Sequence, residues 1–247
     1  MKSVNTDIAY DYIRKRILSG EFPPGHPLLT EVLARDIKVS RTPVRDALRK
    51  LETDGLVSIR AHLGANVKKM ELKEFSEMCD LRLALESHAA GLAARNHTES
   101  DLREIQFALT AMKRLTEQIA RDASEQPLLA ELIHEDVRFH IAVMTAAKND
   151  LMKKEILRLH LINRVVSGTS MDKQPVPKVE ADARRQSVLE KHQDIYTAIA
   201  ASDPAAAKRE MEFHLQEMID HSLLLMTRVE SGVIARELSP EELAYSS

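Results

Sequence analysis

The sequence holds one cysteine, Cys79, among its 247 residues. A single cysteine excludes an intrachain disulfide framework and any zinc or iron–sulfur site built from several cysteines. The sequence also lacks a run of about 18 uncharged apolar residues, the minimum for a membrane-spanning helix. Its first residues have no apolar core of the kind found in secretion signals. We therefore expect a cytoplasmic protein with no membrane partner.

Glycine and aromatic residues are also scarce, with 7 Gly, 5 Phe, 4 Tyr and no Trp. Hydrophobic residues make up 44% of the chain and charged residues 30%, which suffices for a buried core and a solvated surface. Few turn residues and many helix-forming residues predict a mostly α fold. We expect an N-terminal winged helix-turn-helix followed by an antiparallel all-helical bundle of six or seven helices.

The net charge of −3 conceals a strong asymmetry along the chain. Residues 1–69 carry 13 Lys and Arg against 8 Asp and Glu, whereas the remainder carries 22 against 30. A basic segment ahead of an acidic one indicates a head that binds a polyanion. We predict a DNA-binding domain over 1–69, a linker over 70–74, a helical bundle over 75–230 and a tail over 231–247.

The basic segment has the element order of a winged helix-turn-helix. Apolar spacing and turn residues predict helices over 6–19, 31–36 and 40–54, then short strands over 56–60 and 65–69. The same order also suits a small helical domain with a hairpin that does not bind DNA.

The third of these helices decides between the two interpretations. Ser40 is expected to cap it, and Arg41, Arg45 and Arg49 recur at intervals of four, so they share one face. Arginine reads guanine through two hydrogen bonds in the major groove. An arginine stripe without interleaved acids therefore favours DNA binding.

The acidic part predicts six helices, over 72–95, 99–122, 127–147, 150–168, 179–201 and 204–230. Asp136 and His140 are four residues apart on the third of these helices, so their side chains share a face. His140, His192 and His214 lie on the apolar stripes of three different helices. Three separately satisfied core histidines are one interpretation.

The other interpretation of these histidines is a shared divalent cation, because one cation would satisfy the three imidazoles and the carboxylate together. Such a set suits Zn²⁺, Ni²⁺, Mn²⁺ or Fe²⁺. The metal could assist an effector, could be structural or sensed, or could serve a hydrolase. The sequence contains no HExxH, GxSxG, Walker or GxGxxG motif and no cysteine nucleophile motif, so we expect no enzyme.

Arg82 and Glu86 are a further pair at a spacing of four, on the first helix of the bundle. The pair is either a surface ion pair or an inward arginine that holds the carboxylate of a ligand.

Two motif sets carry a family resemblance. The combination of Pro24-Gly25, Leu33-Ala34, Val39-Ser-Arg-Thr-Pro-Val-Arg45 and Ala47-Leu48 resembles the winged-helix domain of the GntR family of bacterial transcription regulators. The second part resembles the FadR-like ligand-binding (FCD) domain. Its matching residues are Arg82-Leu-Ala-Leu-Glu86, Asp136-Val-Arg-Phe-His140, Asn149, His192 and His214.

The resemblance implies a ligand-responsive regulator, expected to act as a repressor, that binds a palindromic double-stranded operator as a homodimer. It implies that Asp136, His140, His192 and His214 hold a metal, which helps to bind a small carboxylate effector. The effector would also meet Arg82, Glu86 and Asn149. The DNA contacts that it implies are Ser40, Thr42 and the three arginines of the third helix, with His62 and Gly64 in the wing.

Two positions depart from the family pattern. The wing tip reads His62-Leu63-Gly64, where many members have Arg before this Gly, and Glu31 stands where the fatty-acid-responsive branch has a DNA-contacting Arg. That branch also lacks the full metal set. A small organic acid therefore fits better than an acyl-CoA.

Overall fold

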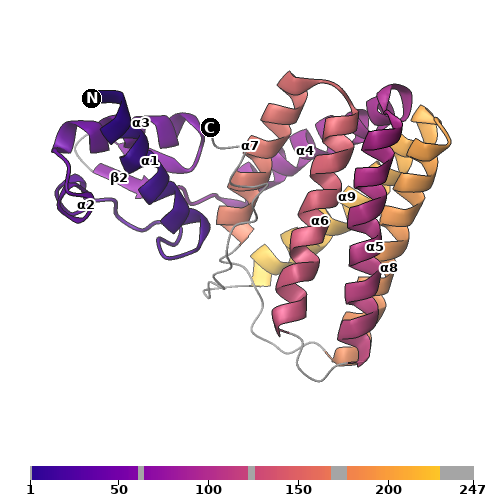
Figure 1. Cartoon of the computed structure of the whole chain (residues 1–247). Coiled ribbons are helices and arrows are strands. Elements are labelled where there is room, and N and C mark those ends of the chain that lie inside the picture. Colours follow the sequence, from indigo (N-terminus) through magenta and orange to yellow (C-terminus); the bar gives the residue numbers. More distant parts are fainter. Residues whose placement is uncertain (1, 61–63, 122–125, 168–176, 229–247) are drawn as a thin grey trace. The chain divides into compact units, whose positions relative to one another are not determined.

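A computed structural model describes residues 2–60, 64–121, 126–167 and 177–228 (Figure 1). Within these ranges the chain is helical apart from one antiparallel hairpin, which confirms the predicted mostly α fold. The elements are α1 (Lys2–Leu18), α2 (Thr30–Ile37), α3 (Arg41–Thr53), β1 (Val57–Arg60), β2 (Gly64–Val67), α4 (Leu72–Asn96), α5 (Glu99–Arg121), α6 (Gln126–Ala146), α7 (Asp150–Ser167), α8 (Lys178–Ala200) and α9 (Pro204–Arg228).

The chain forms two compact units. The first contains residues 1–76 and also takes the later part of α7 from Arg158 and the end of α9 from Ser222. The second contains Glu77–Leu157 and the stretch of α8 and α9 that ends at His221.

The first unit is built around the apolar faces of α1, α2 and α3. Between α2 and α3 the chain turns at Lys38, whose φ of 62° places a non-glycine residue in the left-handed region. The N–H groups of the turn are satisfied by carbonyls of α2, since Val39 N donates to Ala34 O at 3.0 Å. The helices bury Ile13, Leu33, Ala34, Val44, Ala47, Leu48 and Leu51.

The hairpin pairs Val57 with Val67 and Arg60 with Gly64. Gly64 opens β2 with a φ of +87°, a conformation that favours glycine. The segment before α2 runs beside β2 and forms backbone hydrogen bonds with it. Leu28 N donates to Ala65 O, and Val67 N donates to His26 O. The prolines of this segment exclude a helix but do not indicate this pairing.

The second unit is a helical bundle in which α5 packs along both α6 and α8 (Figure 1). Its core combines small residues of α4 with larger ones of the other helices. Gly91 marks a close approach, since a Cβ there would lie 3.1 Å from the carbonyl oxygen of Pro204. The largest fully buried side chains in this unit include Phe139, Ile105, Met112, Ile195 and Ile199.

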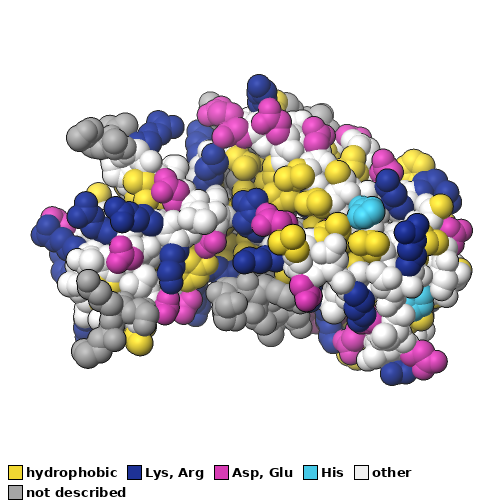
Figure 2. Space-filling model, turned by 90° about the horizontal axis from the view of Figure 1, so that it is seen from above, with side chains coloured by type: hydrophobic (Ala, Val, Ile, Leu, Met, Phe, Trp, Pro, Cys, Tyr) yellow, Lys and Arg dark blue, Asp and Glu magenta, His cyan; other side chains and the backbone are white. Residues whose placement is uncertain are grey.

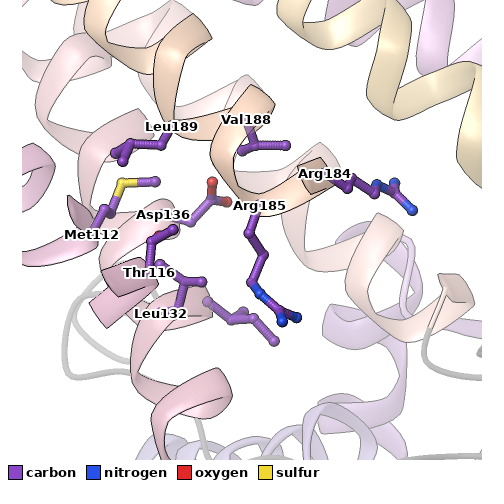
Figure 3. Close-up of a pocket in the computed structure, with 9 residues that line it drawn as sticks. Met112, Thr116, Leu132, Asp136, Arg184, Arg185, Val188 and Leu189 are labelled. Atoms are coloured by element: carbon purple, nitrogen blue, oxygen red, sulfur yellow. The ribbon is translucent and has the colours of Figure 1, made fainter. Parts of the chain in front are cut away.

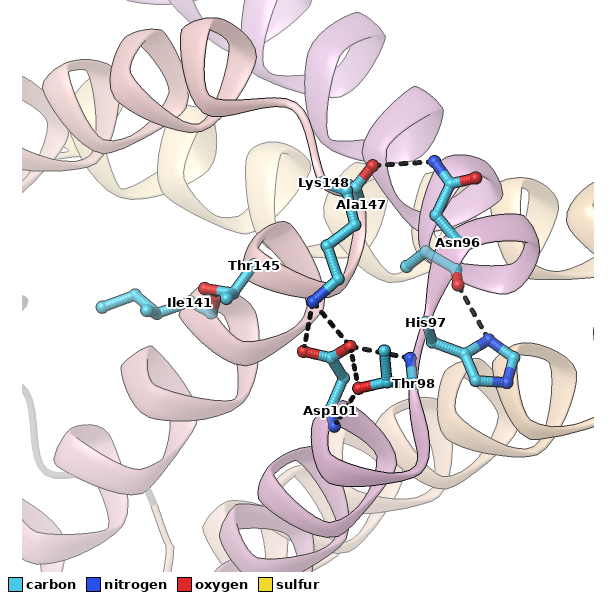
Figure 4. Close-up of polar contacts among 9 residues, drawn as sticks. Asn96, His97, Thr98, Asp101, Ile141, Thr145, Ala147 and Lys148 are labelled. Carbon is cyan, nitrogen blue, oxygen red and sulfur yellow. Dashed lines mark hydrogen bonds and ion pairs between the residues drawn. The ribbon is translucent and has the colours of Figure 1, made fainter.

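Polar contacts link the start of α5 to the end of α6 (Figure 4). Thr98 and Asp101 form a reciprocal cap, in which Thr98 N donates to Asp101 Oδ2 at 2.7 Å and Asp101 N donates to Thr98 Oγ1 at 3.3 Å. Lys148 Nζ donates to Asp101 Oδ1 at 2.7 Å, and Asn96 Nδ2 donates to Ala147 O at 3.0 Å. These contacts connect the end of α4, the start of α5 and the end of α6.

Candidate metal centre and DNA-binding surface

Three histidines from α6, α8 and α9 meet inside the bundle. His140, His192 and His214 are at most 3% exposed, and each offers a ring nitrogen within 4.8 Å of the others. The Nε2 atoms of His140 and His214 lie 3.2 Å apart. The core face that each helix presents therefore places all three imidazoles around one point.

Asp136 joins this group from the same helix as His140. Its Oδ1 lies 3.2 Å from Nε2 of His192. The side chain of Asp136 is 28% exposed, whereas that of His192 is fully buried. The carboxylate is thus the group through which the cluster is open to its surroundings.

The donor geometry fits a metal ion. Two nitrogens bound about 2.1 Å from one ion, at angles of about 90–110°, lie about 3.0–3.4 Å apart. The two 3.2 Å separations, His140 to His214 and His192 to Asp136, fall in this range. In the absence of a cation, two ring nitrogens would face each other and a carboxylate would face an imidazole.

The tautomer of His192 supports the same fit. Its Nδ1 lies 2.7 Å from the carbonyl oxygen of Val188, which can only accept a hydrogen bond. Nδ1 therefore carries the proton, and in the neutral ring Nε2 directs a lone pair toward Asp136. A cation between these two groups would be attracted by both.

The electrostatics of the cluster also suit metal ligation. Burial opposes the charge of Asp136, but its hydrogen bond to His192 and its interactions with the three neighbouring histidines outweigh burial and hold the pKa of Asp136 well below its ordinary value. Burial lowers the pKa of His214 well below its ordinary value, and the charges of His192 and His140 lower it further. An ionised carboxylate and a neutral imidazole are the forms in which these side chains bind a metal.

A buried ion pair lies behind His140. Arg82 Nε donates to Glu86 Oε1 at 3.0 Å, and Glu86 Oε2 lies 3.5 Å from Nδ1 of His140. Because both side chains are at most 5% exposed, the alternative of a surface ion pair is wrong. Burial lowers the pKa of His140, but the hydrogen bond to Glu86 and the charge of Asp136 outweigh it and raise that pKa.

The resemblance implied that Arg82 and Asn149 meet the effector, and the structure shows the contacts that both make within the chain. Arg82 points inward to Glu86. Asn149 is half-buried and caps α7, since its Oδ1 accepts the N–H of Met152 at 3.1 Å. Glu86 contacts the histidine cluster through His140, on the side of that ring away from His214 Nε2.

A cavity of about 190 Å³ opens beside Asp136 (Figure 3). Its walls are mostly apolar and come from α5, α6 and α8. The residues that line it are Met112, Thr116, Leu132, Ile133, Asp136, Arg184, Arg185, Val188 and Leu189. Asp136 belongs to both the cluster and the cavity, so a molecule in this cavity would reach the cluster at Asp136.

Thr116 and Arg185 line the cavity although no sequence motif pointed to them. Arg185 stands seven residues before His192, two helical turns away on the same face of α8. This spacing is the signal that could have identified it. For Thr116, no pattern in the sequence indicates which face of α5 lines a cavity.

The arginines of α3 lie on its exposed face. Arg41, Arg45, Arg49 and Thr42 are exposed, whereas Val44 is buried. Figure 2 shows Lys and Arg side chains gathered on the surface of the N-terminal unit. Arg41 also pairs with Glu31 at 2.9 Å, whereas Arg45 and Arg49 form no ion pair within the described part of the chain.

The remaining predicted DNA contacts flank this helix or lie in the wing. Ser40 is exposed and occupies the N-cap position of α3, but its side chain makes no capping hydrogen bond, so that part of the prediction is wrong. Gly64 is exposed at the start of β2, and His62 lies outside the described residues.

Each of the two parts of the chain matches a model of a known protein family. A model of bacterial regulatory proteins of the gntR family matches residues 5–67, and a model of the FCD domain matches residues 77–217. The chain belongs to the GntR family of regulators with an FCD domain. It is therefore a transcription regulator and not an enzyme.

Individual relatives of this GntR-family regulator cover most of its length. It is 33% identical to the HTH-type transcriptional regulator LutR of Bacillus subtilis, over 83% of the chain and 94% of the relative. It is 30% identical to the HTH-type transcriptional repressor RspR of Escherichia coli, over 87% of each. The fold resembles that of E. coli McbR/YncC, with a TM-score of 0.64, 21% identity and coverage of 91% and 98%.

Among the described residues of this regulator, no helix is long and apolar enough to span a bilayer.

Proposed function

We propose that this GntR-family regulator is a repressor whose affinity for a palindromic operator changes when a small carboxylate binds at a metal in the FCD domain. The observation that carries this proposal is the convergence of three buried histidines and Asp136 beside a cavity. Asp136, His140, His192 and His214 would hold the metal. When bound, the metal supplies positive charge and open coordination positions that attract a carboxylate.

The residues around the cluster have separate roles. Glu86 accepts from Arg82 and stands 3.5 Å from His140, so it fixes the orientation of that ring. Asp136 presents the cluster to the cavity. The apolar walls exclude water, which strengthens the attraction between charges inside.

At the DNA end, Arg45 and Arg49 would read the major groove, with Ser40, Thr42 and Arg41 beside them. Gly64 and His62 would bring the wing to the minor groove. A homodimer would present two such heads to the two half-sites, which must match them in spacing. An effector that shifts the bundle helices would change this spacing and therefore the operator affinity.

A thermal-shift screen against small carboxylates, with and without EDTA, followed by operator binding with each hit, tests the proposal. A ligand at 100 times its Kd stabilises the folded state by about 2.7 kcal/mol. We expect at least one carboxylate to raise Tm only when metal is present, and to change operator affinity.

Two results would contradict the proposal in different ways. A Tm that falls in EDTA, with no response to any carboxylate, would favour a structural or sensed metal. A Tm that changes neither with EDTA nor with any carboxylate would mean that the three histidines are core residues without a metal.

A further inference from the structure

An ion pair joins the first turns of α2 and α3. Nη1 of Arg41, the first residue of α3, lies 2.9 Å from Oε1 of Glu31, the second residue of α2. The two side chains are 68% and 70% exposed, so the pair lies on the surface of the N-terminal unit. In a helix-turn-helix, the N-terminal residues of the second helix contact base edges and the first helix crosses the DNA backbone. The pair therefore stands on the surface that is proposed to meet the operator.

Arg41 differs in this respect from the other two arginines on its face of α3. Arg45 and Arg49 are exposed and form no ion pair within the described residues. In the same part of the chain, Glu31 is the partner of Arg41 and contacts it at Nη1. A guanidinium has five N–H donors in a planar fork, and a guanine contact uses two of them. Arg41 can therefore keep its carboxylate partner and still contact a guanine.

The carboxylate of Glu31 changes what Arg41 can bind. An acidic group on a DNA-binding surface repels phosphates, and the phosphates are the same in every sequence. A phosphate must also compete with Glu31 for the charge of Arg41. A guanine presents O6 and N7 at fixed positions, and an arginine whose guanidinium is already held loses less conformational freedom when it binds them. Glu31 therefore weakens sequence-independent binding and favours a base contact.

The strength of this ion pair depends on its surroundings. An exposed ion pair contributes little in water. Docking onto DNA removes water from around the two charges, and the attraction between Glu31 and Arg41 increases as the effective dielectric constant falls. The pair is thus weak in the free protein and becomes stronger in the complex in which it would act.

From this arrangement we propose that Glu31 is a specificity-determining residue, which holds the guanidinium of Arg41 for a guanine and keeps it from the phosphates. The proposal rests on the DNA contact proposed for Arg41 and adds an acidic residue to that surface. Glu31 acts through Arg41, so it is a positioning residue and reads no base itself. The sequence identified Glu31 only as a departure from the fatty-acid-responsive branch, whereas its contact with Arg41 depends on the fold.

Selection of an operator from random double-stranded DNA, followed by fluorescence anisotropy with the full chain, tests this proposal. The wild type should select a guanine in each half-site that Arg41→Gln no longer selects. Glu31→Gln should relax the preference for the same guanine and lower the ratio of operator to scrambled-DNA affinity about fivefold. Its binding to scrambled DNA should strengthen, with a salt slope steeper by about one for each DNA-binding head, because the released Arg41 gains a phosphate.

Two further variants act as controls. Asp36→Asn removes the same charge from the other end of α2, where Asp36 contacts Arg35 of the same helix. It should leave the guanine preference and the affinity ratio as in the wild type. The double variant of Glu31→Gln and Arg41→Gln should have the affinity ratio of Arg41→Gln alone, because Glu31 acts on specificity through Arg41. Both side chains are exposed, so every variant should keep the Tm of the wild type.

Distinct results would overturn the role of Glu31 and the DNA contact of Arg41. If Arg41→Gln loses the guanine preference but Glu31→Gln keeps it, the role of Glu31 is wrong and the contact of Arg41 stands. The role of Glu31 is also wrong if Glu31→Gln strengthens operator and scrambled DNA by the same factor, since charge repulsion alone would do that. If Arg41→Gln changes neither the selected sequence nor the affinity, Arg41 does not contact DNA and the proposed contact itself fails.

Discussion

The Nε2 atoms of His140 and His214 lie 3.2 Å apart, although 74 residues separate the two histidines in the chain. His140 comes from α6 and His214 from α9, and both are buried. Glu86 on α4 stands behind His140, and Asp136 stands beside His192. Four helices of the bundle thus contribute to one polar cluster within an otherwise apolar core.

Removal of one imidazole tests the metal assignment. We expect His192→Ala to lower the metal content of the purified protein well below that of the wild type, because it deletes one of the proposed ligands. Elemental analysis after dialysis measures this content. His88→Ala, which changes an exposed histidine of α4, is the matched control and should keep the full content. Equal metal content in the wild type and His192→Ala would assign His192 to the core alone.

Glu86 is expected to act on the metal through His140. Glu86→Gln keeps the shape of the side chain but removes the charge 3.5 Å from Nδ1 of His140. Changes behind a ligating histidine cost about 10-fold to 100-fold in metal affinity. Competition with a chelating dye measures the Kd. Because Arg82 would lose a buried partner, stability in EDTA should also be measured, and a lower Tm with unchanged metal Kd would show a packing role only.

Arg45 is expected to provide sequence preference. Arg45→Ala should reduce the difference in binding free energy between operator and scrambled DNA by about 1–3 kcal/mol, since an arginine that contacts a base discriminates by that amount. Fluorescence anisotropy at fixed salt measures both affinities. Arg103→Ala, which removes an exposed arginine of α5, should change neither. If Arg45→Ala still selects the operator as the wild type does, α3 does not read bases through this residue.

The lowered pKa of Asp101 predicts how the free energy of unfolding depends on pH. Burial raises the pKa of its carboxyl, but hydrogen bonds from Lys148 and Thr98 outweigh this and hold the pKa below its ordinary value. Its contribution to the free energy of unfolding is therefore complete above about pH 4 and is lost as the pH falls through the lowered pKa. Asp101→Ala should cost about 1–2 kcal/mol near pH 7, because it removes a cap and an ion pair.

Urea unfolding of the wild type and Asp101→Ala from pH 7 down to pH 2 provides the measurement. The difference between the two should shrink as the pH falls. A difference that stays constant over this range would mean that the ionised carboxylate is not the stabilising form. Asp80→Ala, which changes an exposed aspartate of α4, should show little difference at any pH.

Local patterns are sufficient to place most of the elements. The helix expected over 99–122 is α5, which ends at Arg121, and the one expected from 204 begins at Pro204. Capping residues, proline and the helical spacing of apolar residues act within a few positions of the chain, so they can be read without the fold. Asp136 and His140 share a helix face for the same reason. The edge formed by residues 26–28 on β2 cannot be read this way, because its hydrogen bonds join segments distant in the sequence.

Most helix boundaries, the basic N-terminal part and the inward direction of three of the ten histidines follow from the order of the amino acids. The meeting of these three histidines, the burial of Arg82 and Glu86 and the place of Arg185 in a cavity depend on the packed bundle. The physical reason is that helical periodicity specifies which face of a helix is buried. The neighbour that each face meets depends on how the helices pack, and that packing is set by contacts along the whole bundle.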